Sequence, residues 1–206
     1  MLRPRKRPSL ALALVAAFAW LGHAAADPPP APLHAYPSPP EAGPQPEAAR
    51  PEKPVLLGAV RREQVEAAVP DWVQAEVEAA PDAKAVQALA AVPAGATVTV
   101  YLGSWCGDSR REVSRFWRAL DQLGGEAPFQ LAYVGIDRAK KEPAALVAAT
   151  DLRYVPTFVV QRDGREVGRI VESAPHGIER DLLSLLDGAA HGLITDRTDL
   201  RGEKHP

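Results

Sequence analysis

The feature that most constrains the fold is a change of sequence period at about residue 98. Val98-Thr99-Val100-Tyr101-Leu102 is a β-branched run of the kind found in buried strands. The run ends in Gly103-Ser104-Trp105-Cys106, and apolar residues then recur at helical spacing from Val113 to Leu123. A strand that passes through a short turn directly into an amphipathic helix indicates a domain in which helices pack on a sheet.

The downstream segments continue this pattern. Residues 129–134 have the composition of a second strand, and Pro143 opens an alanine-rich helix. Two further strands, 157–160 and 166–171, flank Asp163-Gly164, a dipeptide typical of tight hairpins, and a final amphipathic helix follows from Ile178. The element order β-α-β-α-β-β-α predicts a mixed α/β sandwich with a parallel part and a C-terminal antiparallel hairpin and helix.

The segment from Val55 to Val92 is predicted to be helical. Two alanine- and glutamate-rich stretches, Arg61 to Ala68 and Asp71 to Ala79, are separated by Pro70, which enforces a boundary. A further helix is expected from Pro81-Asp82 onward. The stretch around Asp71 to Ala79 has an apolar stripe that should pack on the domain. The stripe consists of Val69, Trp72, Val73 and Val77.

The N-terminus has the order of a secretory signal peptide. Arg3, Arg5, Lys6 and Arg7 precede an apolar run from Leu10 to Leu21, and three alanines then offer a cleavage site after Ala26. The alternative is a retained anchor helix, although the run is shorter than the ~20 residues that span a bilayer. The sequence therefore predicts export from the cytoplasm, with no stable membrane span once the signal is removed.

Charge and composition exclude some partners. The whole chain has 24 basic and 26 acidic residues, and four of the basic ones lie in the predicted signal. Removal of the signal leaves 20 basic and 26 acidic residues, a net charge of −6. This balance argues against nucleic acid and against an anionic membrane surface as partners. Residues 27–54 contain 11 of the 21 prolines and few apolar side chains, which is typical of a disordered linker.

Cys106 is the only cysteine of the chain. Exported proteins often contain disulfides, but one cysteine cannot form an internal bridge. Three roles stay open at this point: a buried hydrophobic filler, an intermolecular link, or a reactive thiol.

Two separated motifs carry a resemblance to the thioredoxin superfamily. Residues 105–109, Trp-Cys-Gly-Asp-Ser, stand between a strand and a helix and resemble the family's active-site motif Trp-Cys-Gly-Pro-Cys. Residues 154–158, Tyr-Val-Pro-Thr-Phe, are similar to the segment that holds the family's cis-proline, and residues 133–137 to the end of its central strand. The resemblance spans about residues 80–187. Residues 102–113 are most similar to bacterial exported thioredoxin-like proteins with a CxDS site.

This resemblance implies the fold, and the signal-like N-terminus and the composition of the chain add a location and a domain organisation. The fold is a thioredoxin-like three-layer α/β/α sandwich, and the location is the bacterial periplasm or the extracellular space. The expected parts are a signal peptide (1–26), a proline-rich disordered linker (27–54), a helical extension leading into the fold (55–95), the thioredoxin-like domain (96–188) and a flexible tail (189–206).

The resemblance also implies which residues form the site. Cys106 is the expected nucleophile and Ser109 its supporting residue, in a monothiol CxxS arrangement. An extended substrate would pair with the backbone of Val155, held opposite the thiol by a cis bond to Pro156. The residues expected to contact a protein or peptide thiol or disulfide are Trp105, Gly107, Asp108, Val155, Pro156 and Thr157.

The physics of the predicted position favours a reactive thiol. At the start of a helix, free backbone N–H groups and the positive end of the dipole stabilise a thiolate. Ser109, one turn later, can donate a hydrogen bond to the sulfur, and Arg110 and Arg111 add positive potential if they fold back toward it. Asp108 opposes this effect because a neighbouring carboxylate favours the protonated thiol.

Three departures from the family pattern limit the predicted chemistry. Ser109 replaces the resolving cysteine, so a mixed disulfide at Cys106 needs an external thiol for its release. Val100 stands where thioredoxins usually have a buried aspartate, and Glu172 stands where a glycine is common. The two main hypotheses are a monothiol thiol-disulfide oxidoreductase or isomerase and a redox-inactive module that binds peptides. Peroxide sensing through a sulfenic acid is a third, less favoured one.

No cofactor or metal is predicted. The histidines outside the signal peptide lie in linker, loop or tail, without the spacing of metal ligands or of a Cys-His pair. The sequence shows no phosphate-binding loop and no nucleophile elbow of the hydrolase type.

Overall fold

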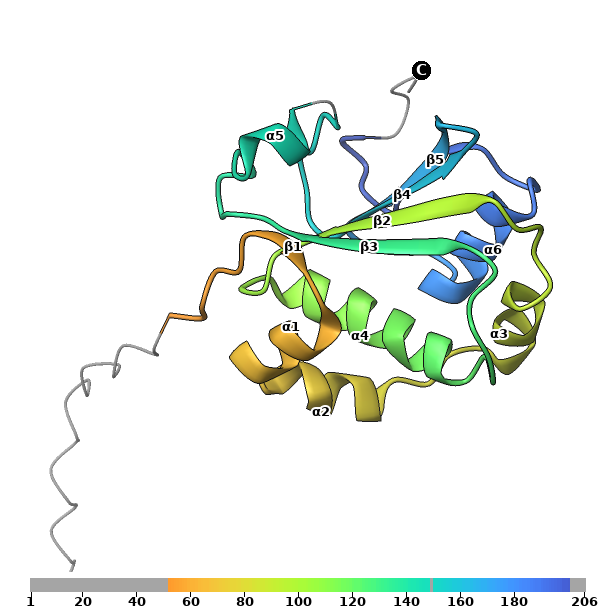
Figure 1. The fold of residues 1–206 in the computed structure, drawn as a ribbon, viewed down its shortest axis with the longest axis horizontal. Coiled ribbons are helices and arrows are strands. Elements are labelled where there is room, and N and C mark those ends of the chain that lie inside the picture. The colour runs from red at the N-terminus through yellow and green to blue at the C-terminus, as the bar shows by residue number, and fades with distance from the viewer. Residues whose placement is uncertain (1–51, 149, 201–206) are drawn as a thin grey trace, which may run out of the picture. The chain divides into compact units, whose positions relative to one another are not determined.

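A computed structural model describes residues 52–148 and 150–200 (Figure 1). The predicted signal peptide and the linker up to residue 51 lie outside the described residues. The elements, in chain order, are β1 (Gly58–Val60), α1 (Arg62–Ala68), α2 (Asp71–Glu78), α3 (Ala83–Leu89), β2 (Ala96–Leu102), α4 (Gly107–Asp121), β3 (Gln130–Gly135), α5 (Ala144–Val147), β4 (Thr157–Arg162), β5 (Arg165–Val171), α6 (Ile178–Leu186) and β6 (Gly192–Ile194).

The strands form one mixed, open sheet in the order β1-β3-β2-β4-β5-β6. β2 and β3 are parallel, β4 is antiparallel to both β2 and β5, and β6 runs parallel to β5. The hairpin β4–β5 turns at Asp163, whose φ is +52°, and Gly164, whose φ is +72°. The predicted fold class, an α/β fold with a mixed sheet and a C-terminal hairpin and helix, is confirmed.

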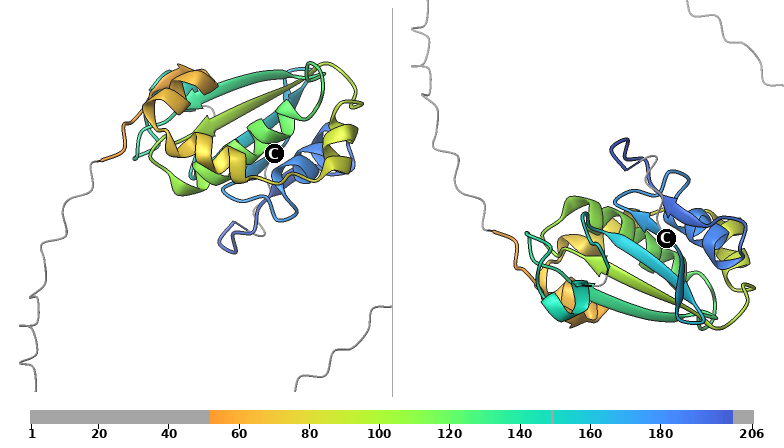
Figure 2. Two further views of the ribbon diagram at one scale, coloured as in Figure 1. Left: turned by 90° about the horizontal axis from the view of Figure 1, so that it is seen from below. Right: turned by 90° about the horizontal axis from the view of Figure 1, so that it is seen from above.

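Helices lie on both faces of the sheet. Figure 1 shows α4 and α6 beneath it, with α1, α2 and α3 on the same side, and α5 above it. The two views in Figure 2 agree with this layering. Helix α2 packs on α4, and α3 packs on α6. The three layers place the end of β2 and the start of α4 at one end of the sheet.

The larger core lies between the sheet and the helices beneath it. Along β2 the side chains alternate, and Ala96, Val98, Val100 and Leu102 are at most 1% exposed. A strand has a period of two, so one face of β2 is directed at the helices. The same core includes an edge-to-face pair of Phe116 from α4 and Phe158 from β4, with ring centroids 5.5 Å apart.

Helix α2 joins this core through one aromatic residue rather than through the whole predicted stripe. Trp72 is fully buried against Trp117 of α4, at 5.4 Å between ring centroids. Val69 is also buried, as expected, but Val73 is 46% exposed and Val77 is 67% exposed. The prediction for these two valines was wrong because a helix of eight residues rests on α4 along a narrow line.

The segment predicted as helical from Val55 begins with a strand instead. β1 is only three residues long and pairs antiparallel with the free edge of β3, so that Ala59 is opposite Val134. A segment this short does not show a period of two. The hydrogen bonds that create β1 come from an edge that only the folded sheet supplies.

The tail predicted to be loose from Ala189 also contains a short strand. β6 pairs with β5, and Gly168 is opposite Gly192. A Cβ at Gly168 would lie 2.5 Å from the carbonyl oxygen of Gly192, so the close approach requires glycine there. Further on, Leu200 is only 4% exposed. Within residues 52–148 and 150–200, no helix is both long and apolar enough to cross a bilayer.

Candidate functional site

The turn between β2 and α4 presents Cys106 at the start of the helix. Cys106 is the N-cap residue of α4, its backbone N–H donates to Gly103 O at 2.9 Å, and its own carbonyl accepts from the N–H of Arg110 at 3.1 Å. A Cβ at Gly103 would lie 2.8 Å from the ring of Trp105, so the turn depends on that glycine. The thiol is half-buried, as a reactive position requires, and is not a fully buried filler.

The cis-proline loop lies opposite the thiol, as the sequence predicted. The bond between Val155 and Pro156 is cis. The thiol of Cys106 donates to the carbonyl oxygen of Val155, with 3.3 Å between sulfur and oxygen. Val155 and Pro156 are both buried, and the hydrogen bond from the sulfur goes to the backbone of Val155. Two segments 49 residues apart in sequence are thereby brought together.

Ser109 has a different partner from the one expected. Its hydroxyl accepts a hydrogen bond from the backbone N–H of Gly103 at 3.1 Å, and the side chain is fully buried. The expected donation to the sulfur of Cys106 is not among the hydrogen bonds of the described residues. The turn leaves Gly103 N–H without a backbone partner in this position, and the hydroxyl one turn into the helix satisfies it. Ser109 therefore holds the turn in shape.

Trp105 is held at its two ends by the segment after β3. Its indole N–H donates to Ile136 O at 3.1 Å, and the guanidinium of Arg138 lies 5.1 Å from the ring centroid. The ring packs with Cys106 on a small apolar cluster between the sheet and α5, made of Val134, Ile136, Val147 and Val155. The residue before the thiol is thus fixed in orientation.

Asp108 is neutralised by its own neighbour. Arg111 binds Asp108 at 2.7 Å, Glu112 at 2.9 Å and the hydroxyl of Ser173 at 3.0 Å, so it bridges the start of α4 and the loop after β5. Burial raises the pKa of Glu112, and the guanidinium of Arg111 only partly offsets this effect. Arg110 does not fold toward the thiol and lies 3.9 Å from Asp71.

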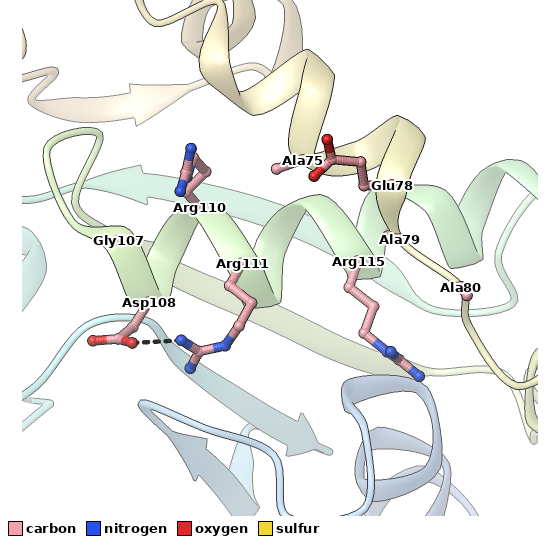
Figure 3. Close-up of a pocket in the computed structure, with 9 residues that line it drawn as sticks. All are labelled: Ala75, Glu78, Ala79, Ala80, Gly107, Asp108, Arg110, Arg111 and Arg115. Atoms are coloured by element: carbon pink, nitrogen blue, oxygen red, sulfur yellow. Dashed lines mark hydrogen bonds and ion pairs between the residues drawn. The ribbon is translucent and has the colours of Figure 1, made fainter. Parts of the chain in front are cut away.

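A groove of about 600 Å³ runs along α4 beside the end of α2, and Figure 3 shows the arginines that line it. It begins at Gly107 and Asp108, but neither Cys106 nor the cis-proline loop is among its lining residues. Its third arginine, Arg115, is engaged with a buried carboxylate, Glu179, at 2.7 Å. The groove therefore adjoins the thiol through Gly107 and Asp108.

The other expected site residues have structural roles. Thr157 is 1% exposed, and its hydroxyl donates to the carbonyl of Tyr154 at 2.8 Å, which closes the proline loop. Val100 is fully buried, and its side chain has no titratable group. Glu172 has a φ of +65°, a left-handed conformation that favours glycine, and its N–H donates to Pro156 O at 2.8 Å.

Two segments reach the site that sequence reasoning did not assign to it. On one side, the hydroxyl of Ser104 accepts from Leu56 N–H at 3.0 Å and donates to Pro54 O at 2.6 Å. These two hydrogen bonds hold the end of the linker against the turn that contains Trp105. A lone serine in a turn gives no sequence signal for such a long-range bond.

On the other side, residues 195–200 lie against the cis-proline loop. Arg197 binds Glu172 at 2.5 Å and stacks on Tyr154, with 3.7 Å between guanidinium carbon and ring centroid. The phenol of Tyr154 donates to Asp199 at 2.7 Å, and this bond raises the pKa of Tyr154. The polar composition of this segment predicted a loose tail, and its partners become visible only in three dimensions.

Within residues 52–148 and 150–200, no group of three or more histidine, cysteine or acidic side chains is arranged to hold a metal ion. His176 binds the carboxylate of Asp181 at 2.8 Å, away from Cys106 in the loop before α6. The described residues place three kinds of group at the site: the thiol, the backbone of the proline loop and the charged side chains around them.

Comparisons with known proteins return matches among solved structures only. No family model and no curated protein matches the chain. A protein of unknown function from Pseudomonas aeruginosa is 17% identical, with a TM-score of 0.45 over 62% of this chain and 86% of its own. An HIV epitope-scaffold is 18% identical, with a TM-score of 0.43 over 62% and 87%. A mutant thioredoxin from Halobacterium salinarum is 20% identical, with a TM-score of 0.34 over 53% and 86%.

Proposed function

We propose that this protein is an exported, bacterial-type thioredoxin-like monothiol oxidoreductase or isomerase that acts through Cys106. The observation that carries the proposal is the position of the sulfur. It lies at the N-cap of α4, half-exposed, and 3.3 Å from the carbonyl that precedes the cis-proline. The signal-like start of the chain supports a location in the periplasm or outside the cell.

The reaction begins with attack of the Cys106 thiolate on a disulfide of a protein or peptide. A new bond forms between Sγ and one substrate sulfur, while the other substrate sulfur leaves as a thiolate. An external thiolate then attacks the substrate sulfur of this mixed disulfide and forms a new disulfide with it. Cys106 leaves as a thiolate, so the protein itself ends unchanged. If the second thiolate belongs to the same substrate, the net result is isomerisation.

The remaining parts of the site have roles in this cycle. Free N–H groups at the start of α4 stabilise the thiolate, as they stabilise other anions at helix starts. The pairing of Asp108 with Arg111 reduces the opposition that the carboxylate presents. Ser109 offers no second thiol, so release depends on the external one.

Trapping of the mixed disulfide tests this proposal. The mature protein is mixed with a peptide whose single cysteine is a mixed disulfide with thiopyridine, and adducts are identified by mass spectrometry. We expect an adduct on Cys106 that accumulates, because no internal thiol resolves it, and that disappears on addition of a small thiol. Cys106→Ser should form none. A thiol that iodoacetamide alkylates but that forms no adduct would overturn the redox proposal.

One observation favours the alternative, a redox-inactive module that binds peptides. The hydroxyl of Ser109 is bound to Gly103 N–H and not to the sulfur, and the buried Val100 has no group that could transfer a proton. Under this alternative, Cys106→Ser binds the partner as tightly as the wild type does. Loss of binding in this variant would contradict the alternative and favour the redox function.

A further inference from the structure

The loop after β3 contains cations that have no carboxylate partner. In Arg138-Ala139-Lys140-Lys141, hereafter the 138–141 loop, Arg138 and Lys141 are exposed and Lys140 is half-buried. Among the ion pairs of residues 52–148 and 150–200, none involves these three side chains. By contrast, most arginines of the described chain lie within 4 Å of a carboxylate, including Arg62, Arg110, Arg111, Arg115, Arg169, Arg180 and Arg197.

The two carboxylates that flank the loop bind backbone N–H groups instead of its cations. Asp137 accepts from the N–H groups of Ala139, Lys141 and Glu142 at 3.1, 2.7 and 2.8 Å. These bonds hold its pKa below the usual range, so it stays ionised and fixed in place. Glu142 accepts from Ala144 N–H at 3.0 Å. The side-chain cations of the loop are thus left to solvent or to a partner.

The 138–141 loop contacts Trp105, the residue that precedes Cys106. Arg138 lies over the ring of Trp105, and the indole N–H of Trp105 donates to Ile136 O, directly after β3. Two other carboxylates beside the site, Asp108 and Glu172, are paired with Arg111 and Arg197 and not with the loop. Residues 137–142 have three basic and two acidic side chains, a formal net charge of +1, in a chain whose mature part has a net charge of −6. Within the part of the chain that the structure describes, the basic side chains of this segment are free of ion pairs, so they are available to carboxylates of a partner.

We propose that the 138–141 loop docks an acidic segment of the partner polypeptide, one that flanks the cysteine presented to Cys106. The proposal rests on the proposed function and names its substrate class. Three cations within four residues, each on a long side chain, suit several carboxylates of one segment better than a single small anion. Complementary charge also speeds the encounter of the two sulfurs.

Two activated peptides test this inference. Each contains one cysteine as a mixed disulfide with thiopyridine, flanked by glutamates in one peptide and by glutamines in the other. Stopped-flow absorbance gives the rate of thiopyridine release by the mature protein. We expect the acidic peptide to react faster, on the order of tenfold at low ionic strength, and the ratio to fall toward one as salt shortens the Debye length below ~10 Å.

The variant R138Q/K140Q/K141Q should bring the ratio close to one. The matched control is K84Q/R165Q, which removes two exposed cations on α3 and at the start of β5; Arg165 lies beside the strand end opposite to Cys106. A ratio that the loop variant does not change would overturn the inference, and so would an equal fall in the control. Circular dichroism confirms that both variants are folded.

Binding separates this inference from the proposed redox function. In Cys106→Ser, fluorescence anisotropy of the same peptides without thiopyridine should show tighter binding of the acidic one, lost in the loop variant. If this holds while no peptide reacts with the wild type, the docking inference stands and the redox proposal fails. A small dianionic aromatic disulfide gives a further comparison. If its reaction is faster in the wild type than in the loop variant by as much as that of the acidic peptide, the loop attracts any small anion and the peptide-docking inference is overturned. Loop-dependent binding to anionic lipid vesicles, with no preference between the peptides, would overturn it too.

Discussion

The two faces of the sheet differ in how they are built. Beneath the sheet, α2, α4 and α6 bury a large cluster that includes Trp72, Trp117, Phe116 and Phe158. Above it, next to Cys106, the apolar cluster is small and is closed by irregular segments that polar contacts hold in place. The comparison teaches that stability resides mainly on one face, whereas the thiol lies at the end of the sheet next to the smaller cluster on the other face. Substitutions on the two faces should therefore separate the two properties.

The largest effect is expected on the stable face, from Trp117→Ala. The ring is buried between Trp72 and Tyr133, so its removal leaves a cavity among large side chains. We expect a loss of about 3–5 kcal/mol in the free energy of unfolding, measured in urea. The exposed Val73 on the adjoining helix is the control, because Val73→Ala should change stability by less than about 0.5 kcal/mol. If Trp117→Ala alters the alkylation rate of Cys106 in the folded protein, the two faces are not independent.

A smaller loss is expected from Glu179→Gln, which disturbs a buried ion pair on the same face. Glu179 is fully buried, binds Arg115 through two bonds and accepts from Asp82 N–H at 2.8 Å. Burial alone would raise the pKa of Glu179, but these hydrogen bonds outweigh it and the pKa is lowered. We expect a loss of about 1–3 kcal/mol at pH 7.

The pH dependence of stability checks the origin of that loss. Because the pKa of Glu179 is lowered on folding, the unfolded state binds more protons in the window between the two values. The contribution of Glu179 is present above the unfolded pKa and is lost as the pH falls through the folded one. In Glu179→Gln, this part of the acid-side decline should disappear, so an unchanged decline would assign the stability to other groups.

The same contrast explains what could be predicted from the sequence. The strand at 98–102, the helix after Cys106 and the hairpin at Asp163 have strong local patterns, and each is found in the structure. β1, β6 and the ties of Ser104 and Arg197 have no such pattern, because each depends on a partner that is distant in sequence. The approach of Cys106 to Val155 was predictable only through the resemblance of two motifs, and the partner of Ser109 depends on the shape of a turn.

Two buried serines of α4 allow a further comparison between the site and the core beneath the sheet. Ser109 accepts from Gly103 N–H at the site, whereas the hydroxyl of Ser114 donates to Trp72 O at 3.2 Å on the stable face. Both side chains are fully buried, so Ser109→Ala and Ser114→Ala should each cost about 1–2 kcal/mol in urea unfolding. Only Ser109→Ala should change the alkylation rate of Cys106, because it loosens the turn that presents the thiol. Equal alkylation in both variants would show that Ser109 has no part in positioning the thiol.

The smallest effect, and the one of opposite sign, is expected from Glu112 beside the site. This residue is 7% exposed, and burial raises the pKa of its carboxyl more than Arg111 lowers it. The folded state then binds more protons than the unfolded state in the window above the ordinary glutamate pKa, so this group makes stability fall as the pH rises through that window. Glu112→Gln should remove that fall and leave stability at pH 7 unchanged or slightly higher, which thermal unfolding between pH 4 and pH 7 measures. A clear loss of stability at pH 7 would mean that the bond from Arg111 to Glu112 supports the fold, and that the site face contributes more to stability than its small core indicates.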